Sequence, residues 1–179
     1  TIPHGREVND RLDWICLTNA MLNVTSMESK PHARDFYATY QLGVDFNAGA
    51  PARCDAWLRF LEQTIQTPAA IAQLQEFFGY CLTRDTRFEK CLLLIGPGAD
   101  GKSTCLKVLR RLIGPDNCSA VGFSDLEDQF QRAAIYGKLL NISTEIGGRA
   151  LESQIFKALV SGDPINAAFK HRDSFSFIP

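Results

Sequence analysis

The sequence predicts an α/β fold preceded by a small mixed segment of strands and helices. From residue 91 onward, stretches with strand character alternate with stretches of helical periodicity, which is typical of a sheet covered by helices. Before residue 89, β-rich stretches come first and two amphipathic helices follow. The chain has 179 residues, 45% apolar and 22% charged, which excludes a largely disordered protein and suits one packed domain with an appendage.

Residues 1–50 are predicted to be rich in β-strand. Residues 14–17 and 22–24 flank a turn-prone Thr-Asn pair, and residues 36–46 are rich in aromatic and β-branched side chains. A Gly-Ala-Pro sequence at 49–51 then breaks the chain. We expect a small module here, and its sequence assigns it no binding partner.

Residues 51–88 are predicted to form two helices. Trp57, Leu61 and Ile65 recur at intervals of four, and Pro68 starts the second helix by fixing its first turn. The apolar stripe of the second helix contains Ile71, Leu74, Phe78 and Leu82. Such stripes are typical of a helix–helix core, so we expect packing and no chemistry from this segment.

The rest of the chain alternates between strand and helix patterns. An unbroken apolar run at 91–95 predicts a strand covered on both faces, and residues 102–113 predict a helix ended by Gly-Pro. A capping-box pattern at 124–127 predicts the start of another helix. Residues 138–144 are then predicted to form a strand and residues 151–160 a helix.

Residues 96–103, GPGADGKS, fit the pattern G-x-x-x-x-G-K-S/T at every fixed position, between a predicted strand and a predicted helix. Glycines let backbone N–H groups turn toward a phosphate, and the helix N-terminus adds positive charge. Lys102 is expected to reach the β- and γ-phosphates and Ser103 to ligate Mg²⁺. The sequence therefore predicts a nucleoside triphosphate with Mg²⁺ in a partial P-loop domain at residues 89–179. The predicted nucleotide site consists of Gly96, Pro97, Gly98, Ala99, Asp100, Gly101, Lys102, Ser103 and Thr104.

Glu145 is the candidate catalytic acid. It follows the predicted strand 138–144 and lies 43 residues after Lys102. A carboxylate at the C-terminal end of a strand beside a phosphate loop can orient the attacking water, so the predicted metal ligands are Ser103 and Glu145. The usual arrangement has two acids together, and here Thr144 occupies the first place, where it could hold a metal-bound water.

Residues 162–178 predict a β-hairpin with a cationic tip. Alternating apolar residues flank Lys170, His171 and Arg172, the predicted DNA-binding residues. Such a tip can pair with nucleic-acid phosphates without reading bases, although an ordinary solvated turn has the same local pattern.

Net charge and cysteine spacing narrow the setting. The formal net charge is −1, so any nucleic-acid site has to be local. The six cysteines form no zinc or redox motif, which suits a reducing, cytoplasmic setting. Cys81, Cys91 and Cys105 are expected to be small buried hydrophobes. No apolar run in the sequence is long enough to span a membrane.

Taken together, the motifs resemble the helicase part of phage and plasmid primase–helicases, the poxvirus-type group of superfamily III helicases within the AAA+ ATPases. In the predicted P-loop domain the resemblance rests on GPGADGKST, GKLLNISTE and LVSGDPINAAFKHRDSFSF. In the preceding part it rests on CDAWLRFLEQ and LQEFFGYCLTRDTRFEKCLLLIG. The resemblance covers nearly the whole chain, and three ordered motifs are more specific than one phosphate loop.

The resemblance implies an AAA+-like ATPase domain in an ATP-dependent DNA helicase, with ATP and Mg²⁺ as cofactors. Lys102 and Glu145 would be its catalytic residues, and Lys170 and His171 would face a central pore and grip single-stranded DNA. Such enzymes form hexameric rings with ATP between two subunits, so a homo-oligomer is expected. A cytoplasmic location in a bacterial host, with no membrane partner, is also implied.

Two features of that family would follow the hairpin, beyond Pro179: a strand ending in a polar sensor, and an arginine that reaches a neighbour's γ-phosphate. We therefore expect this chain to be a piece of a longer protein, truncated within its ATPase domain, that hydrolyses ATP poorly on its own. No primer-synthesis motif occurs in the sequence either.

Two other functions fit the same phosphate loop. A nucleotide or small-molecule kinase would need a substrate pocket and usually a lid with arginines, and the sequence has no clustered arginine lid. A nucleotide-gated assembly module would bind ATP without motor function. Dependence on single-stranded DNA would separate the helicase from the kinase, and a chain extended past Pro179 would separate it from the assembly module.

Overall fold

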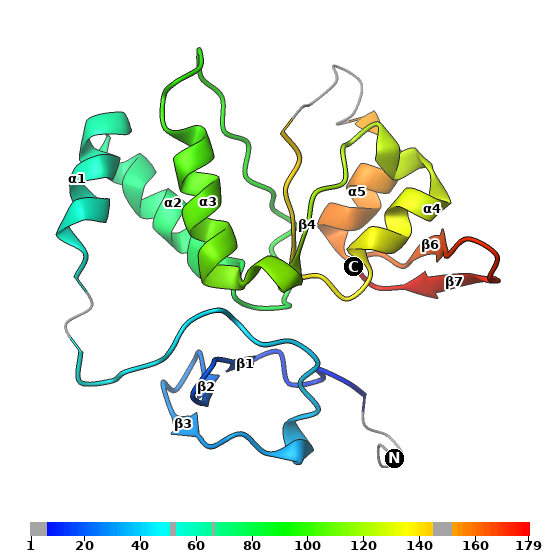
Figure 1. Cartoon of the computed structure of the whole chain (residues 1–179), viewed down its shortest axis with the longest axis horizontal. Helices are drawn as coiled ribbons and strands as arrows, with labels where there is room; N and C mark the ends of the chain where they lie inside the picture. The colour runs from blue at the N-terminus through cyan, green and yellow to red at the C-terminus, as the bar shows by residue number, and fades with distance from the viewer. Residues whose placement is uncertain (1–6, 51–52, 66, 145–151) are drawn as a thin grey trace.

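The computed structural model describes residues 7–50, 53–65, 67–144 and 152–179. Figure 1 shows an N-terminal module of short strands below a row of helices, with a β-hairpin at the far side. Buried apolar side chains form one core that joins the N-terminal module to the first three helices, and a second core beneath the hairpin.

The N-terminal module is a three-stranded antiparallel sheet of β1 (Trp14–Cys16), β2 (Met21–Asn23) and β3 (Ser29–Lys30), in that order. Asn23 ends β2, and its side-chain oxygen accepts hydrogen bonds from two of the following backbone N–H groups, at 2.9 Å each. This local bonding turns the chain toward β3. The two strands predicted before residue 25 are confirmed.

The stretch 36–46 is not a strand, so that prediction is wrong. It follows a 3₁₀ turn, η1 (Arg34–Phe36), and has no sheet ladder. Its apolar side chains serve packing instead: Leu42 is fully buried. The N–H of the next residue, Gly43, donates to the carbonyl of Leu112 at 3.2 Å. This stretch therefore fastens the N-terminal module to the end of a later helix.

α1 (Asp55–Thr64) and α2 (Pro68–Tyr80) confirm the two helices predicted before residue 89. Pro68 occupies the first turn of α2, where its missing N–H costs nothing. Trp57 of α1 stacks on Phe78 of α2 with ring centroids 6.2 Å apart. The apolar stripes therefore meet in one core, as predicted, and its buried members from these helices are Leu61, Leu74 and Phe78.

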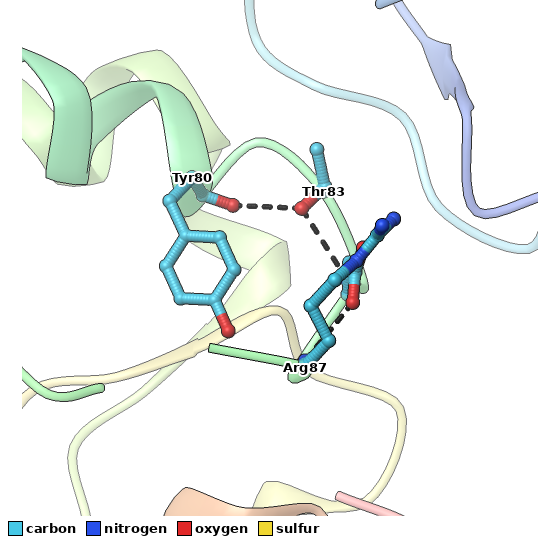
Figure 2. A network of polar contacts seen from close by, with 4 residues as sticks. Tyr80, Thr83 and Arg87 are labelled. Atoms are coloured by element: carbon cyan, nitrogen blue, oxygen red, sulfur yellow. Dashed lines mark hydrogen bonds and ion pairs between the residues drawn. The ribbon is translucent and has the colours of Figure 1, made fainter. Parts of the chain in front are cut away.

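The turn after α2 is held by a local polar network, which Figure 2 shows. The Thr83 hydroxyl donates to the Tyr80 carbonyl at 2.9 Å, and the Arg87 N–H donates to the Asp85 carboxylate at 2.9 Å. The Arg87 side chain also hydrogen-bonds this carboxylate, and this bond lowers the pKa of Asp85. The turn thereby fixes the direction in which the chain leaves α2.

α3 (Lys102–Ile113) confirms the helix predicted at 102–113 and ends at Gly114. After it comes a short turn, η2 (Pro115–Asn117). A two-residue parallel ladder then joins β4 (Cys118–Ser119) to β5 (Leu140–Asn141). The strand predicted at 138–144 is thus formed only over β5.

The apolar run 91–95 pairs with no strand in the described part of the chain, and its prediction as a strand covered on both faces is wrong. Leu93 is 44% exposed and Ile95 is 84% exposed. Cys91 is exposed too, contrary to the prediction, whereas Cys81 and Cys105 are buried as predicted. Residues of the run and of β5 line the same cavity, and no ladder joins them in the described part of the chain.

Residues 124–135 form short turns in place of the single helix predicted from the capping box. These are η3 (Asp125–Glu127), α4 (Gln129–Arg132) and η4 (Ala133–Ile135). Ser124 makes no capping hydrogen bond. Asp128 caps instead, because its carboxylate accepts from the Phe130 N–H at 2.8 Å. The cap therefore lies four residues later than predicted.

α5 (Gln154–Ser161) confirms the helix predicted near 151–160. The predicted hairpin is also confirmed, as the antiparallel pair β6 (Ile165–Ala168) and β7 (Ser174–Phe177). Arg132 is buried beneath it, and its guanidinium donates to the carbonyls of Asn166 and Leu126, both at 2.7 Å. A buried cation with three carbonyl acceptors thus joins β6 to η3.

Candidate functional site

The predicted phosphate loop, residues 96–103 and called the phosphate loop below, connects the run 91–95 to α3 and forms the crest above α3 in Figure 1. Gly98, Ala99 and Gly101 have positive φ angles of 106°, 52° and 86°. Glycine adopts such angles without strain, so the loop can bend where the motif places its glycines. α3 begins directly after Gly101, and no side chain caps its first turn. Such an arrangement suits an anion.

Lys102 already holds an anion inside this loop. Its Nζ lies 2.6 Å from each oxygen of the Asp100 carboxylate and 3.0 Å from the Gly96 carbonyl oxygen. The side-chain hydrogen bond from Lys102 lowers the pKa of Asp100, so this carboxyl is ionised at neutral pH. A Cβ on Gly96 would lie 1.6 Å from one oxygen of the same carboxylate. The carboxylate thus occupies the position beside Lys102 where a phosphate oxygen is expected.

Gly101 is restricted by packing as well as by its φ angle. A Cβ at this position would lie 2.9 Å from Cζ of Phe60 and 3.0 Å from the methyl group of Thr64, both on α1. Trp57 stacks on Phe60 with ring centroids 5.3 Å apart, which holds that ring in place. α1 therefore backs the phosphate loop directly.

A cavity of about 620 Å³ opens beside the loop. Lys102 and Ser103 line it from α3, and Thr144 lines it from the segment after β5. Most of its wall is apolar, with side chains such as Leu94 and Leu106. Lys102 and Ser103, two residues of the predicted nucleotide site, thus line the same cavity as Thr144, which precedes the predicted acid Glu145.

The predicted catalytic acid, Glu145, lies outside the described residues. Within the part of the chain that the structure describes, no group of three or more His, Cys, Asp or Glu side chains could hold a metal ion. Ser103 and Thr104 are exposed in the first turn of α3. Mg²⁺ prefers oxygen ligands and is commonly held by few protein groups plus substrate phosphates. Ser103 therefore fits an Mg²⁺ ion that arrives with a triphosphate.

Lys170, His171 and Arg172 lie together at the exposed tip between β6 and β7. The Arg172 N–H donates to the Phe169 carbonyl at 3.0 Å, which closes a four-residue turn, and His171 has a φ of 63°. Among the described residues, neither Lys170 nor Arg172 forms an ion pair. The tip does not line the cavity and lies across α5 from the phosphate loop in Figure 1. The predicted sites are therefore two separate places.

Two features of the loop were missed by sequence reasoning. Asp100 was predicted only as one residue of the nucleotide site, and its ion pair with Lys102 was not foreseen. An acid two residues before the lysine is the signal that could have indicated it. Phe60 lies 41 residues before Gly101, and nothing in its helical stripe indicates that it backs a loop.

Two family models match the chain. Residues 3–66 match the model described as D5 N terminal like, which represents the N-terminal part of D5-like phage and viral primase–helicase proteins. Residues 94–179, from just before the phosphate loop through the hairpin, match a family of unknown function (DUF5906). The first match links the N-terminal module and α1 to a DNA-replication setting. The second assigns no activity to the part that carries the phosphate loop.

Among the described residues, no helix is long and apolar enough to cross a membrane. The longest of the helices that flank the cavity, α2, has 13 residues, against roughly 20 needed for a span.

Proposed function

We propose that this chain is part of a phage or plasmid primase–helicase and belongs to its ATP-dependent DNA helicase, which hydrolyses ATP to move on single-stranded DNA. One observation carries the proposal: Lys102, at the first turn of α3, holds the Asp100 carboxylate within a glycine loop. A lysine and a helix N-terminus that hold a carboxylate also suit a phosphate. The match of residues 3–66 to the D5 N terminal like model supports the primase–helicase setting.

In the proposed site, the chain's own residues bind and orient the triphosphate. Lys102 exchanges Asp100 for the β- and γ-phosphate oxygens, and the loop N–H groups bind the remaining oxygens. The Ser103 hydroxyl would hold Mg²⁺, and the ion would supply positive charge to the phosphates. Glu145 would orient the attacking water and accept its proton. Thr144 lines the same cavity as Lys102 and its hydroxyl would help to hold a water there.

The hairpin tip is the proposed contact with DNA. Lys170 and Arg172 form no ion pair among the described residues, so both are available for backbone phosphates. The AAA+-like ATPase domain is proposed to assemble into a hexameric ring in which a neighbouring subunit completes each ATP site. ATP turnover would then move the hairpins relative to the strand.

The test is ATP hydrolysis with and without a poly-dT oligonucleotide, measured on this chain and on a form extended beyond Pro179. We expect DNA to stimulate the extended form, and we expect Lys170→Ala to lose this stimulation while keeping basal turnover. Lys107→Ala, an exposed lysine on α3, is the matched control and should behave as the unaltered protein. If DNA does not change the rate of ATP hydrolysis, the helicase proposal is wrong and a kinase is favoured.

A further inference from the structure

Four aromatic rings run along the hairpin and form what we call the aromatic row: Tyr136, Phe169, Phe175 and Phe177. Phe169 lies flat on Phe175, with ring centroids 5.2 Å apart and an interplanar angle of 18°. Tyr136 meets Phe175 and Phe177 edge-on at 5.1 and 5.3 Å. Phe177 is buried in the second core, so the row is anchored at one end.

Two rings of the aromatic row are open to solvent. Phe169 is 42% exposed and Tyr136 is 54% exposed. Single exposed apolar residues are ordinary on protein surfaces. Here, however, the partly exposed ring of Phe169 stacks on Phe175, and a closed turn begins at its own carbonyl. The exposed part of such a ring is a surface on which another flat ring can stack.

Positive charge surrounds this ring. Lys170 follows Phe169 directly in the chain, and the Arg172 guanidinium carbon lies over the Phe169 ring, 6.0 Å from its centroid. That distance is at the outer limit of a cation–π contact. Between residues 169 and 174 the only acid is Asp173. The tip thus combines an aromatic face with an excess of cations.

We propose that Phe169 stacks against a base of single-stranded nucleic acid while Lys170 and Arg172 pair with the flanking phosphates. This inference rests on the proposed function and adds a base contact to a tip that was predicted to contact phosphates alone. The combination is the one by which proteins bind single strands without sequence preference: cations along the backbone and aromatic rings beneath the bases. A partner protein surface would need no such excess of positive charge.

The test compares two labelled oligonucleotides of equal length, oligo-dT and an abasic strand with the same backbone, by fluorescence anisotropy on the 179-residue chain. Phe169→Leu should weaken binding of oligo-dT roughly tenfold. It should leave binding of the abasic strand unchanged, because that strand offers no base to stack. Phe88→Leu, an exposed phenylalanine after α2, is the matched control and should change neither affinity.

Salt dependence separates the two kinds of contact. Lys170→Ala should weaken both strands and lower the slope of log affinity against log salt by about 0.7. Phe169→Leu should leave that slope unchanged. If Phe169→Leu loses the same affinity for both strands, or loses affinity for neither, the proposed base contact is wrong. A change in sedimentation in Phe169→Leu would instead make this face a contact between copies of the chain and also overturn it. If the unaltered protein binds neither strand, the proposed function itself falls.

Discussion

Lys102 in the phosphate loop and Lys170 at the hairpin tip are both expected to meet phosphate, but their surroundings differ. Lys102 has a side chain 30% exposed and is held by Asp100 at 2.6 Å. Lys170 is exposed and has no ion pair among the described residues. Binding at the loop therefore exchanges one anion for another, whereas binding at the tip adds an anion where none was.

The difference predicts different selectivity. An exchange site favours a ligand that outcompetes a carboxylate, such as a triphosphate with several oxygens and Mg²⁺. An open cationic tip attracts any polyanion and responds strongly to salt. If the two regions are distinct, a substitution in one should leave the ligand affinity of the other unchanged.

The largest effect is expected from Lys102→Ala. Without its ammonium group the loop loses the side-chain contact to the β- and γ-phosphates, so ATP affinity should fall roughly 30-fold or more. Isothermal titration calorimetry with Mg-ATP measures this, with Lys107→Ala as the control on the same helix. Affinity for oligo-dT should not change, since the tip does not line the cavity. Loss of DNA affinity in Lys102→Ala would contradict the separation of the two regions.

Arg132→Met tests the support of the hairpin. The substitution leaves the carbonyls of Leu126, Glu127 and Asn166 without their buried donor. Urea unfolding should show a loss of about 2–4 kcal/mol in the free energy of unfolding. DNA affinity should fall as the hairpin loosens.

The Arg132→Met protein also provides a check on the phosphate loop. ATP affinity, measured at low temperature where the variant is folded, should stay within about twofold of the unaltered protein, because Arg132 packs against the second core and not against α3. A parallel loss of ATP and DNA affinity would mean that the two regions act as one unit.

A smaller effect, an increase in the affinity for Mg-ATP, is expected from Asp100→Asn. The amide keeps the shape of the side chain but removes the negative charge that Lys102 holds, so Mg-ATP should bind roughly two- to fivefold more tightly. A fluorescent ATP analogue measures the change. Asp116→Asn, which changes an exposed acid in η2 just after α3, is the control. Weaker binding in Asp100→Asn would show that Asp100 supports the nucleotide and does not compete with it.

The smallest effect concerns pH. Because Lys102 lowers the pKa of Asp100 below its ordinary value of 3.8, the carboxylate stays ionised throughout the neutral range. The competition it exerts is therefore fully present above pH 3.8 and is lost only as pH falls through the lowered pKa. The ratio of ATP affinities between the unaltered protein and Asp100→Asn should accordingly be constant between about pH 5.5 and 8.5. A ratio that drifts within that window would refute the ion pair.

Periodicity and turn chemistry predicted much of this fold from the sequence. α1, α2, α3 and the β6–β7 hairpin follow from apolar spacing, from Pro68 and from the glycines that begin and end α3. These features are local, so a short window of sequence contains them. The placement of the loop glycines and of the tip cations was predictable for the same reason.

The rest depended on contacts between distant segments. The run 91–95 is apolar enough for a buried strand, but a sequence pattern cannot say what lies beside it. In the structure, residues of this run line a cavity. The capping box at Ser124 failed because Asp128 offers a competing cap to a shorter helix. The local sequence around Arg132 does not distinguish it from a surface cation. Its burial depends on hydrogen bonds from its guanidinium to carbonyls of β6 and η3.

The contact between Gly101 and α1 limits how this protein can be cut into smaller pieces. A fragment beginning at residue 89, the predicted start of the P-loop domain, would contain every residue of the motif GPGADGKS. It would lack the rings of Phe60 and Trp57, which stand behind the loop. The smallest transplantable unit that keeps the proposed nucleotide site intact therefore begins at α1, more than thirty residues before the motif GPGADGKS.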